Sequence, residues 1–281
     1  MIQLTGQTGT ASSEDIARLR NQLGLDKPLY EQYIRWAGGI AHGDFGLSMY
    51  TRQPVIDEIK RRFPVTFELA ILSSLIAVIL SLPLGVISAM RQDSWVDYIF
   101  RVVSIGGIAI PMFWTATIFI LILVLWFNTM PPLIYANLFK DPLTNLQQFM
   151  WPAFALGYNL TSITARMTRS CVLEALRQDY VRTARAKGLR EISIIISHVL
   201  KNAMIPVLTL FGMNFAFTLG GTVIMENIFS IPGIGQLLLT SIQTRDYVVL
   251  GDMVLLFTFA VLIVNLLTDI AYLWFDPRIR Y

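Results

Sequence analysis

The side chains most able to bind another molecule are four cations gathered around one glycine. Arg182, Arg185, Lys187 and Arg190 surround Gly188. Cationic side chains this close together attract anionic surfaces, such as the headgroups of a membrane, and a glycine among them marks a break in regular structure. The segment therefore predicts a binding surface rather than a catalytic centre.

Apolar residues recur at helical spacing on both sides of Gly188, from Val172 to Tyr180 and from Leu189 to Val199. This pattern predicts a helix, a break and a second helix. Two functions fit it. A basic amphipathic helix can lie on anionic headgroups, or it can place its apolar face in the groove of a partner protein. Spacing alone leaves both open.

Residues suited to catalysis or metal binding are few. Cys171 is the one cysteine, and the two histidines, His42 and His198, are far apart in the sequence. Isolated residues of these types do not predict a metal site. A nucleotide-binding P-loop needs a lysine directly after a glycine, and no Gly-Lys pair occurs in the sequence. We therefore expect no enzyme activity, no cofactor and no metal.

Composition identifies the class of protein. Of 281 residues, 54% are hydrophobic and 15% are charged, and the mean hydropathy is +0.57. Soluble domains are nearer 45–50% apolar and about 25% charged, so the composition predicts a membrane protein. The net charge is +3, but the basic residues lie between apolar runs rather than in one patch, and a nucleic-acid partner is not expected.

Five apolar runs are long enough for membrane-spanning helices, which need roughly 20 residues each. A soluble protein with five buried helices of this length and so few charges is a poor alternative. The third run is the weakest, because polar residues interrupt it. We predict an all-α, polytopic membrane helix bundle with spans at Val65–Met90, Ile99–Phe127, Phe149–Met167, Met204–Met225 and Val248–Phe275.

Residues 1–64 are more polar and form a separate N-terminal segment. Helix signals predict one helix near Ser13–Leu23 and a second near Leu29–Ala37, and glycines mark a turn at residues 43–46. The transmembrane domain then covers residues 65–275, and a short tail covers 276–281.

Lys and Arg are distributed unevenly between the two sides of the membrane. If the spans alternate in direction, one side receives only Lys140 and Arg245 in its short loops. The other receives twelve: Arg91, Arg101, eight basic residues from Arg166 to Lys201, Arg278 and Arg280. Cytoplasmic loops carry the excess of basic residues, so we predict a cytoplasmic loop at 171–203, a cytoplasmic C-terminus and an external N-terminal segment. That segment has no signal peptide to carry it across, so we expect a sixth span upstream of Met1.

Polar side chains inside apolar runs are costly and often functional. Those within or beside the predicted spans are Glu68, Asn159, Arg166, Asn214, Glu226 and Asp269. Asn159 and Asn214 lie deepest and are the candidates for lining a pathway, whereas the carboxylates lie near predicted ends. Pro83 and Pro111 kink their helices or are tolerated there, and the pairs Gly106-Gly107 and Gly220-Gly221 predict close helix packing.

Four separated parts of the sequence resemble the permease subunits of ABC importers, in particular the dipeptide, oligopeptide and nickel branch. DYVRTARAKG at 179–188, followed by HVLKNAMIP at 198–206, is similar to that family's cytoplasmic loop. GLDKPLY at 24–30 and GDFGLS at 43–48 resemble its external segment. ENIFSIPGIG at 226–235 resembles the loop between its last two spans, and DPRIRY at 276–281 resembles its C-terminus. The resemblance covers nearly the whole chain, and within the branch the glutathione-type permeases look close.

The resemblance implies a permease of a bacterial or archaeal cytoplasmic membrane that does not itself hydrolyse ATP. Its partners would be a second related permease, two ATPase subunits and an external substrate-binding protein. Nucleotide-driven closure of the ATPases would move the spans through the cytoplasmic loop. The loop residues that would lie in the ATPase cleft are Arg182, Thr183, Ala184, Lys187 and Gly188. The broader family often has Glu-Ala-Ala ahead of this glycine, and residues 182–184 depart from that pattern.

In this family the binding protein usually decides selectivity, so the sequence leaves open a peptide, glutathione or a nickel chelate as the substrate. A gradient-driven secondary transporter is the alternative function. That class typically shows inverted repeats and a functional buried carboxylate, and it does not require the long basic loop. We therefore predict a permease subunit of an ABC importer that takes up peptides or similar small solutes.

Overall fold

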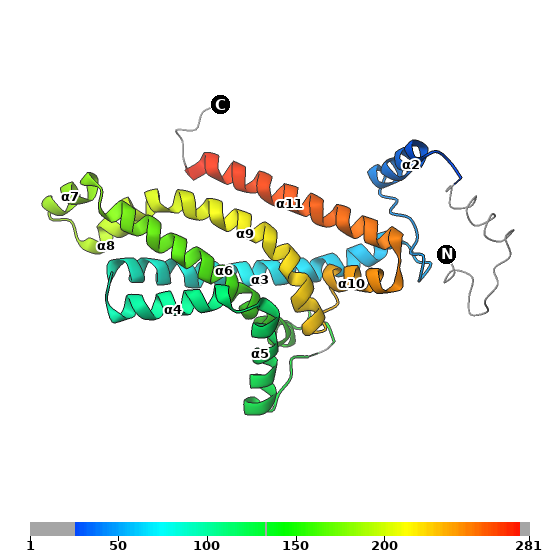
Figure 1. Ribbon diagram of the computed structural model, residues 1–281, viewed down its shortest axis with the longest axis horizontal. Coiled ribbons are helices and arrows are strands. Elements are labelled where there is room, and N and C mark those ends of the chain that lie inside the picture. The colour runs from blue at the N-terminus through cyan, green and yellow to red at the C-terminus, as the bar shows by residue number, and fades with distance from the viewer. Residues whose placement is uncertain (1–25, 133, 276–281) are drawn as a thin grey trace.

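The computed structural model describes residues 26–132 and 134–275, with side chains described to residue 270. The regular elements of these residues are helices, accompanied by a single isolated β-bridge. The long helices form an elongated bundle, with α2 (Leu29–Ala41) at one end and α7 (Asp179–Ala186) and α8 (Glu191–Ile194) at the other (Figure 1). The all-α prediction is confirmed.

The N-terminal segment is partly described. α2 confirms the helix predicted at Leu29–Ala37, and Gly43 and Gly46 adopt φ values of +82° and +73° in the predicted turn. The helix predicted at Ser13–Leu23 lies outside the described residues. The segment is attached to the far end of the bundle, because the Ser48 hydroxyl donates to the buried Asp246 carboxylate at 2.5 Å.

The first long helix, α3 (Val55–Met90), begins ten residues before the span predicted to start at Val65. In its first turns, Val55 and Ile59 are buried in a cluster with Ile234 and Met253, and the side of the membrane on which these turns lie stays a prediction. Pro64 and Pro83 lie inside α3 without ending it.

The span predicted at Ile99–Phe127 is two helices rather than one. α4 (Trp95–Ala109) and α5 (Met112–Phe127) meet at an angle of 106°. Pro111 stands at the break and has no backbone N–H, so it cannot continue the hydrogen-bond ladder of α4. Figure 1 shows α5 projecting away from the parallel helices.

The remaining long helices are α6 (Pro142–Leu176), α9 (Leu200–Ile228) and α11 (Tyr247–Phe275), with the shorter α10 (Ile234–Thr244) before α11. By length and composition, three helices of the described chain can cross a membrane, or four if the bent pair counts as one span. They are α3, the run Glu191–Ile228 and α11 as far as Ile270. α6 has sufficient length, but its polar residues keep it out of this set, so its span stays a prediction.

The run Glu191–Ile228 is continuous because α8 passes into α9 through a π-helical turn, η2 (Ile195–Val199). The segment predicted as the loop 171–203 contains the end of α6, the helices α7 and α8, η2 and the start of α9. Its position in the cytoplasm stays a prediction.

Small residues allow the helices to approach closely. A Cβ on Gly85 would lie 2.6 Å from the Thr168 side chain, which brings α3 against α6. Each predicted glycine pair allows such a contact, because a Cβ on Gly107 or Gly221 would lie 2.0 Å or 3.0 Å from a side chain of α6. In the second pair the contact belongs to Gly221, since an added Cβ on Gly220 would have no described atom within 4 Å.

Candidate functional site

α7 is a short helix that covers the end of the bundle between α6 and α9. Its inner face is formed by Val181 and Ala184, which are three residues apart and therefore on one side of the helix. Both are buried against a cluster that includes Ala89 of α3, Val172 of α6 and Val199 of η2. Ala184 is 7% exposed, so this candidate contacts the chain's own core rather than the surface.

The outer face of α7 presents the other predicted residues. Arg182, Thr183 and Lys187 are exposed, and so is Gly188. Two apolar side chains of the helical run that follows, Ile192 and Ile196, are also 59% and 61% exposed. We call Arg182, Thr183, Lys187, Gly188, Ile192 and Ile196 the docking surface. It combines cations with apolar side chains.

The turn after α7 is held in one conformation by local hydrogen bonds. Gly188 adopts φ +76°, and its N–H donates to the Arg185 carbonyl at 2.9 Å, while the Leu189 N–H reaches the Ala184 carbonyl at 3.3 Å. This is the left-handed helix ending that glycine favours. Arg185 also donates to the Glu191 carboxylate, with Nε–Oε2 at 3.2 Å. That bond raises the pKa of the Arg185 guanidinium, and it joins the end of α7 to the start of α8.

A buried ionic contact joins α3, α4 and α6. Asp97, in the first turn of α4, has a side chain with 0% exposure. Its carboxylate accepts two bonds from Arg169 of α6, Nε to Oδ1 and Nη2 to Oδ2, both at 2.7 Å. It accepts a third from Arg101 at 2.7 Å and a fourth from the Ser88 hydroxyl of α3 at 2.5 Å. We call these four residues the carboxylate clamp.

Sequence reasoning missed the carboxylate clamp and selected Arg166 instead. Arg166 is exposed, whereas Arg169, three residues later on α6, points to the buried carboxylate. The sequence offers little signal for Asp97, because it follows the helix cap Ser94 and an acid in the first turn of a helix is ordinary. Its contact with Arg169 joins residues 72 positions apart and is seen only in the structure.

Glu226 also has a defined structural role. Its carboxylate accepts from the Thr66 hydroxyl at 2.6 Å and from the Gln236 backbone N–H at 2.9 Å, in the first turn of α10. It therefore satisfies a free donor at that helix start. A Cβ on Gly233 would lie 2.3 Å from the Glu226 carboxyl carbon, which explains why glycine precedes α10. The ENIFSIPGIG segment is a joint between α9 and α10 that is also bound to Thr66 of α3.

The side-chain amides of the two predicted pathway residues both donate hydrogen bonds to backbone carbonyls. Asn159 of α6 donates from Nδ2 to the Gly107 carbonyl at 2.8 Å. That carbonyl would bind the residue-111 N–H in a continuous helix, and Pro111 has none. Asn214 donates to the Leu210 carbonyl of its own helix at 2.7 Å. Asn159 thus supports the bend between α4 and α5. A pathway role for either residue stays a prediction.

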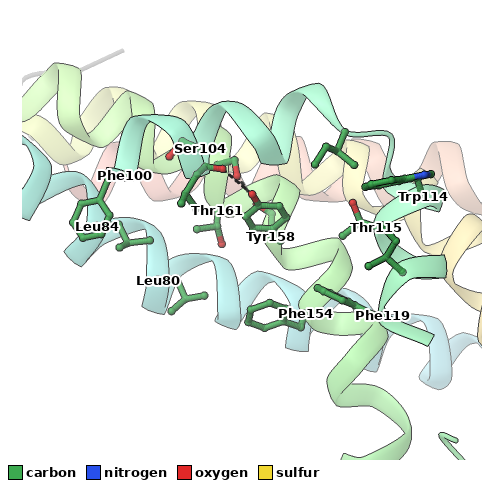
Figure 2. Close-up of a pocket in the computed structure, with 14 residues that line it drawn as sticks. Leu80, Leu84, Phe100, Ser104, Trp114, Thr115, Phe119, Phe154, Tyr158 and Thr161 are labelled. Carbon is green, nitrogen blue, oxygen red and sulfur yellow. Dashed lines mark hydrogen bonds between the residues drawn. The ribbon is translucent and has the colours of Figure 1, made fainter. Parts of the chain in front are cut away.

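An apolar cavity of about 370 Å³ lies beside this bend. α3, α4, α5 and α6 all contribute to its walls, and Figure 2 shows Leu80, Phe100, Phe119 and Tyr158 around it. The Tyr158 hydroxyl donates to the Val103 carbonyl at 2.7 Å, so its polar atom is already satisfied. The described residues that line this cavity do not include Asn159 or Asn214.

Comparisons with known proteins agree with this arrangement. Residues 81–281 match the family described as the binding-protein-dependent transport system inner membrane component, and residues 4–70 match the N-terminal component of the same kind of protein. The glutathione transport system permease protein GsiC of Escherichia coli K12 is 38% identical over 271 residues, covering 96% of this chain and 86% of that protein. The protein of the same name from Shigella dysenteriae serotype 1 has the same identity and coverage.

Among solved structures, a chain of the inward-facing MetNI methionine ABC transporter is similar in fold. The TM-score is 0.65 at 15% identity, with 78% of this chain and 96% of that chain covered. A bundle of membrane-spanning helices with a short helix across one end is thus the fold of an ABC importer transmembrane domain.

The chain belongs to the family of binding-protein-dependent inner membrane transport components. It is a permease subunit of an ABC importer, a multi-pass protein of the inner membrane, and not an enzyme. The importer prediction is confirmed, and the secondary-transporter alternative is not favoured.

Proposed function

We propose that the docking surface is the contact through which separate ATPase subunits drive this permease. The carrying observation is the division of α7 into two faces. Val181 and Ala184 seat the helix in an apolar cluster that also contains residues of α3, α6 and α9, while Arg182 and Thr183 of α7 and Lys187 just after it are exposed. A force applied to the exposed face can therefore reach these long helices through the cluster.

The headgroup-binding alternative is less well supported by this geometry. A helix lying on a membrane buries its apolar face in lipid, and the apolar face of α7 is buried within the chain itself. The exposed apolar residues Ile192 and Ile196 follow on α8 and η2, where a protein partner could cover them together with the cations. Family membership supports the same assignment, because importers of this family depend on other subunits.

The complete importer would contain a second permease, two ATPase subunits and an external binding protein. The external side would be the end that carries α2, and the docking surface would be cytoplasmic. The substrate would be a small peptide, and glutathione is the first compound to test because the curated relatives are named for it. Uptake of labelled glutathione, a dipeptide and a nickel chelate by cells expressing the transporter, compared with a deletion strain, separates these substrates.

Site-directed cross-linking tests the docking surface. Cys171 is replaced by alanine, and single cysteines are then placed at Thr183 or Lys187 on the docking surface, or at Tyr50 near the opposite end as a control. We expect a cysteine-reactive photocross-linker to join the first two positions, and not the third, to an ATPase subunit. An active complex with no cross-link at either docking position would refute the proposal.

A further inference from the structure

We infer that the carboxylate clamp carries movement of the docking surface into α4, so that α4 and α6 move as one unit during transport. The inference rests on the proposed docking of ATPase subunits to α7. It assigns Asp97 and Arg169 as positioning residues, which act through the helices and contact neither nucleotide nor substrate.

The way α4 is attached to the bundle is the first argument. In the part of the chain that the structure describes, α4 has two buried residues, Asp97 near its start and Gly107 near its end. Both face α6, where Arg169 binds the first and Asn159 binds the carbonyl of the second. The two contacts are ten residues apart along each helix, or about 15 Å. α4 is therefore fixed to α6 by a polar contact at each end.

The position of the clamp is the second argument. Ser88 precedes Ala89 on α3, and Arg169 lies two residues before Cys171 on α6. Ala89 and Cys171 belong to the apolar cluster on which α7 is seated. Movement of α7 thus reaches the clamp through adjacent residues of two helices, and the clamp is the contact that joins both helices to the start of α4.

The chemistry of the contact is the third argument. Dispersion contacts between apolar side chains are individually weak and undirected, so no single one fixes the register of two helices. A two-pronged guanidinium–carboxylate contact has a fixed geometry. Separating the buried Asp97 carboxylate from Arg169 would remove two charge-assisted hydrogen bonds and leave the ion pair with Arg101, which belongs to α4 itself. The clamp therefore resists relative sliding of α4 and α6.

A consequence concerns the bend after α4. α5 continues from α4 at 106°, so displacement of α4 along α6 would also displace α5. If α4 is locked to α6, movement of the docking surface also moves α4 and α5, although neither helix is next to α7 in the sequence.

The test compares two arginines of the same helix. Arg169→Lys keeps the charge but removes the two-pronged contact, and Arg166→Lys makes the same change three residues earlier on an exposed site. Ser88→Ala removes only the bond to α3. Each variant is purified with its ATPase subunits and placed in proteoliposomes, and labelled glutathione transported per ATP hydrolysed is measured with the glutathione-loaded binding protein. We expect this ratio to fall about tenfold for Arg169→Lys, to fall less for Ser88→Ala and to be unchanged for Arg166→Lys.

The ratio distinguishes coupling from stability, because loss of folded protein lowers transport and ATP hydrolysis together. An unchanged ratio in both Arg169→Lys and Ser88→Ala would overturn the inference, even if total transport fell. Failure of the wild-type protein to purify with ATPase subunits would instead remove the proposed docking function, so the two ideas fail by different results.

Discussion

Replacing Gly188 with aspartate adds a carboxylate to the docking surface without a steric conflict. A Cβ at this position would have no described atom within 4 Å, so the strain comes only from the backbone φ of +76°. The left-handed conformation costs an L-residue roughly 1–2 kcal/mol, and Asp and Asn adopt it more readily than most. Typical unfolding free energies are about 5–15 kcal/mol. We therefore expect Gly188→Asp to reach the membrane in normal amounts.

Gly188→Asn is the matched control, because it has nearly the same shape and backbone strain without the charge. Residues 179–191 contain four basic and two acidic side chains, a net charge of +2, and the new aspartate reduces it to +1. Two charges about 4 Å apart interact by roughly 1 kcal/mol in water and by more near a protein surface. Since 1.4 kcal/mol is a factor of ten in affinity, we expect ATPase-subunit binding to fall about tenfold further in Gly188→Asp than in Gly188→Asn.

The assay has three measurements on each variant: permease in the membrane fraction, ATPase subunits recovered with it, and substrate uptake. The expected result for Gly188→Asp is normal membrane content with reduced ATPase binding and reduced uptake. Normal uptake by a well-expressed Gly188→Asp variant would refute the docking role of this turn. Equal losses in the Asp and Asn variants would show that backbone strain, rather than charge, is responsible.

Two further changes test the joints of the bundle by thermal unfolding in detergent. Gly233→Ala places a Cβ within 2.3 Å of the buried Glu226 carboxyl carbon and should destabilise the protein by about 1–3 kcal/mol. The control Gly220→Ala adds a Cβ with no described atom within 4 Å and should be neutral or slightly stabilising. A neutral Gly233→Ala would contradict the tight packing of Gly233 against Glu226. Asn159→Leu leaves the proline-freed carbonyl without its donor and should cost about 1–3 kcal/mol. Asn214→Leu loses only a bond within its own helix and should cost less, and the reverse order of the two losses would count against a support role for Asn159.

Much of the fold is readable from composition and period. Spanning helices need only length and apolar content, so α3, the helix through α9 and α11 are evident in the sequence. The inward position of Ala184 is also implied by local pattern, because Val181 precedes it by three residues. The resemblance to the family implied an ATPase contact for Ala184, whereas its spacing from Val181 implies an inward position on the helix.

Other features depend on contacts between distant segments. Pro111 predicts an interruption, but the 106° angle at the bend also depends on the Asn159 amide that takes up the freed carbonyl. The early start of α3 follows from burial of Val55 against helices that come almost 200 residues later in the chain. A sequence pattern contains no information on such partners.

The sequence by itself determined that this protein is an all-α membrane protein with a basic amphipathic element between two long helices, because hydropathy and helical period are local properties; the permease assignment came from the resemblance of its motifs to a family. Only the tertiary structure decided which charges are paired. Asp97 and Arg169 are 72 residues apart and look like an ordinary helix-start acid and one of several basic residues. They become a buried contact because antiparallel packing of α4 and α6 brings them together where water cannot solvate the carboxylate, and charges in such a place must be paired.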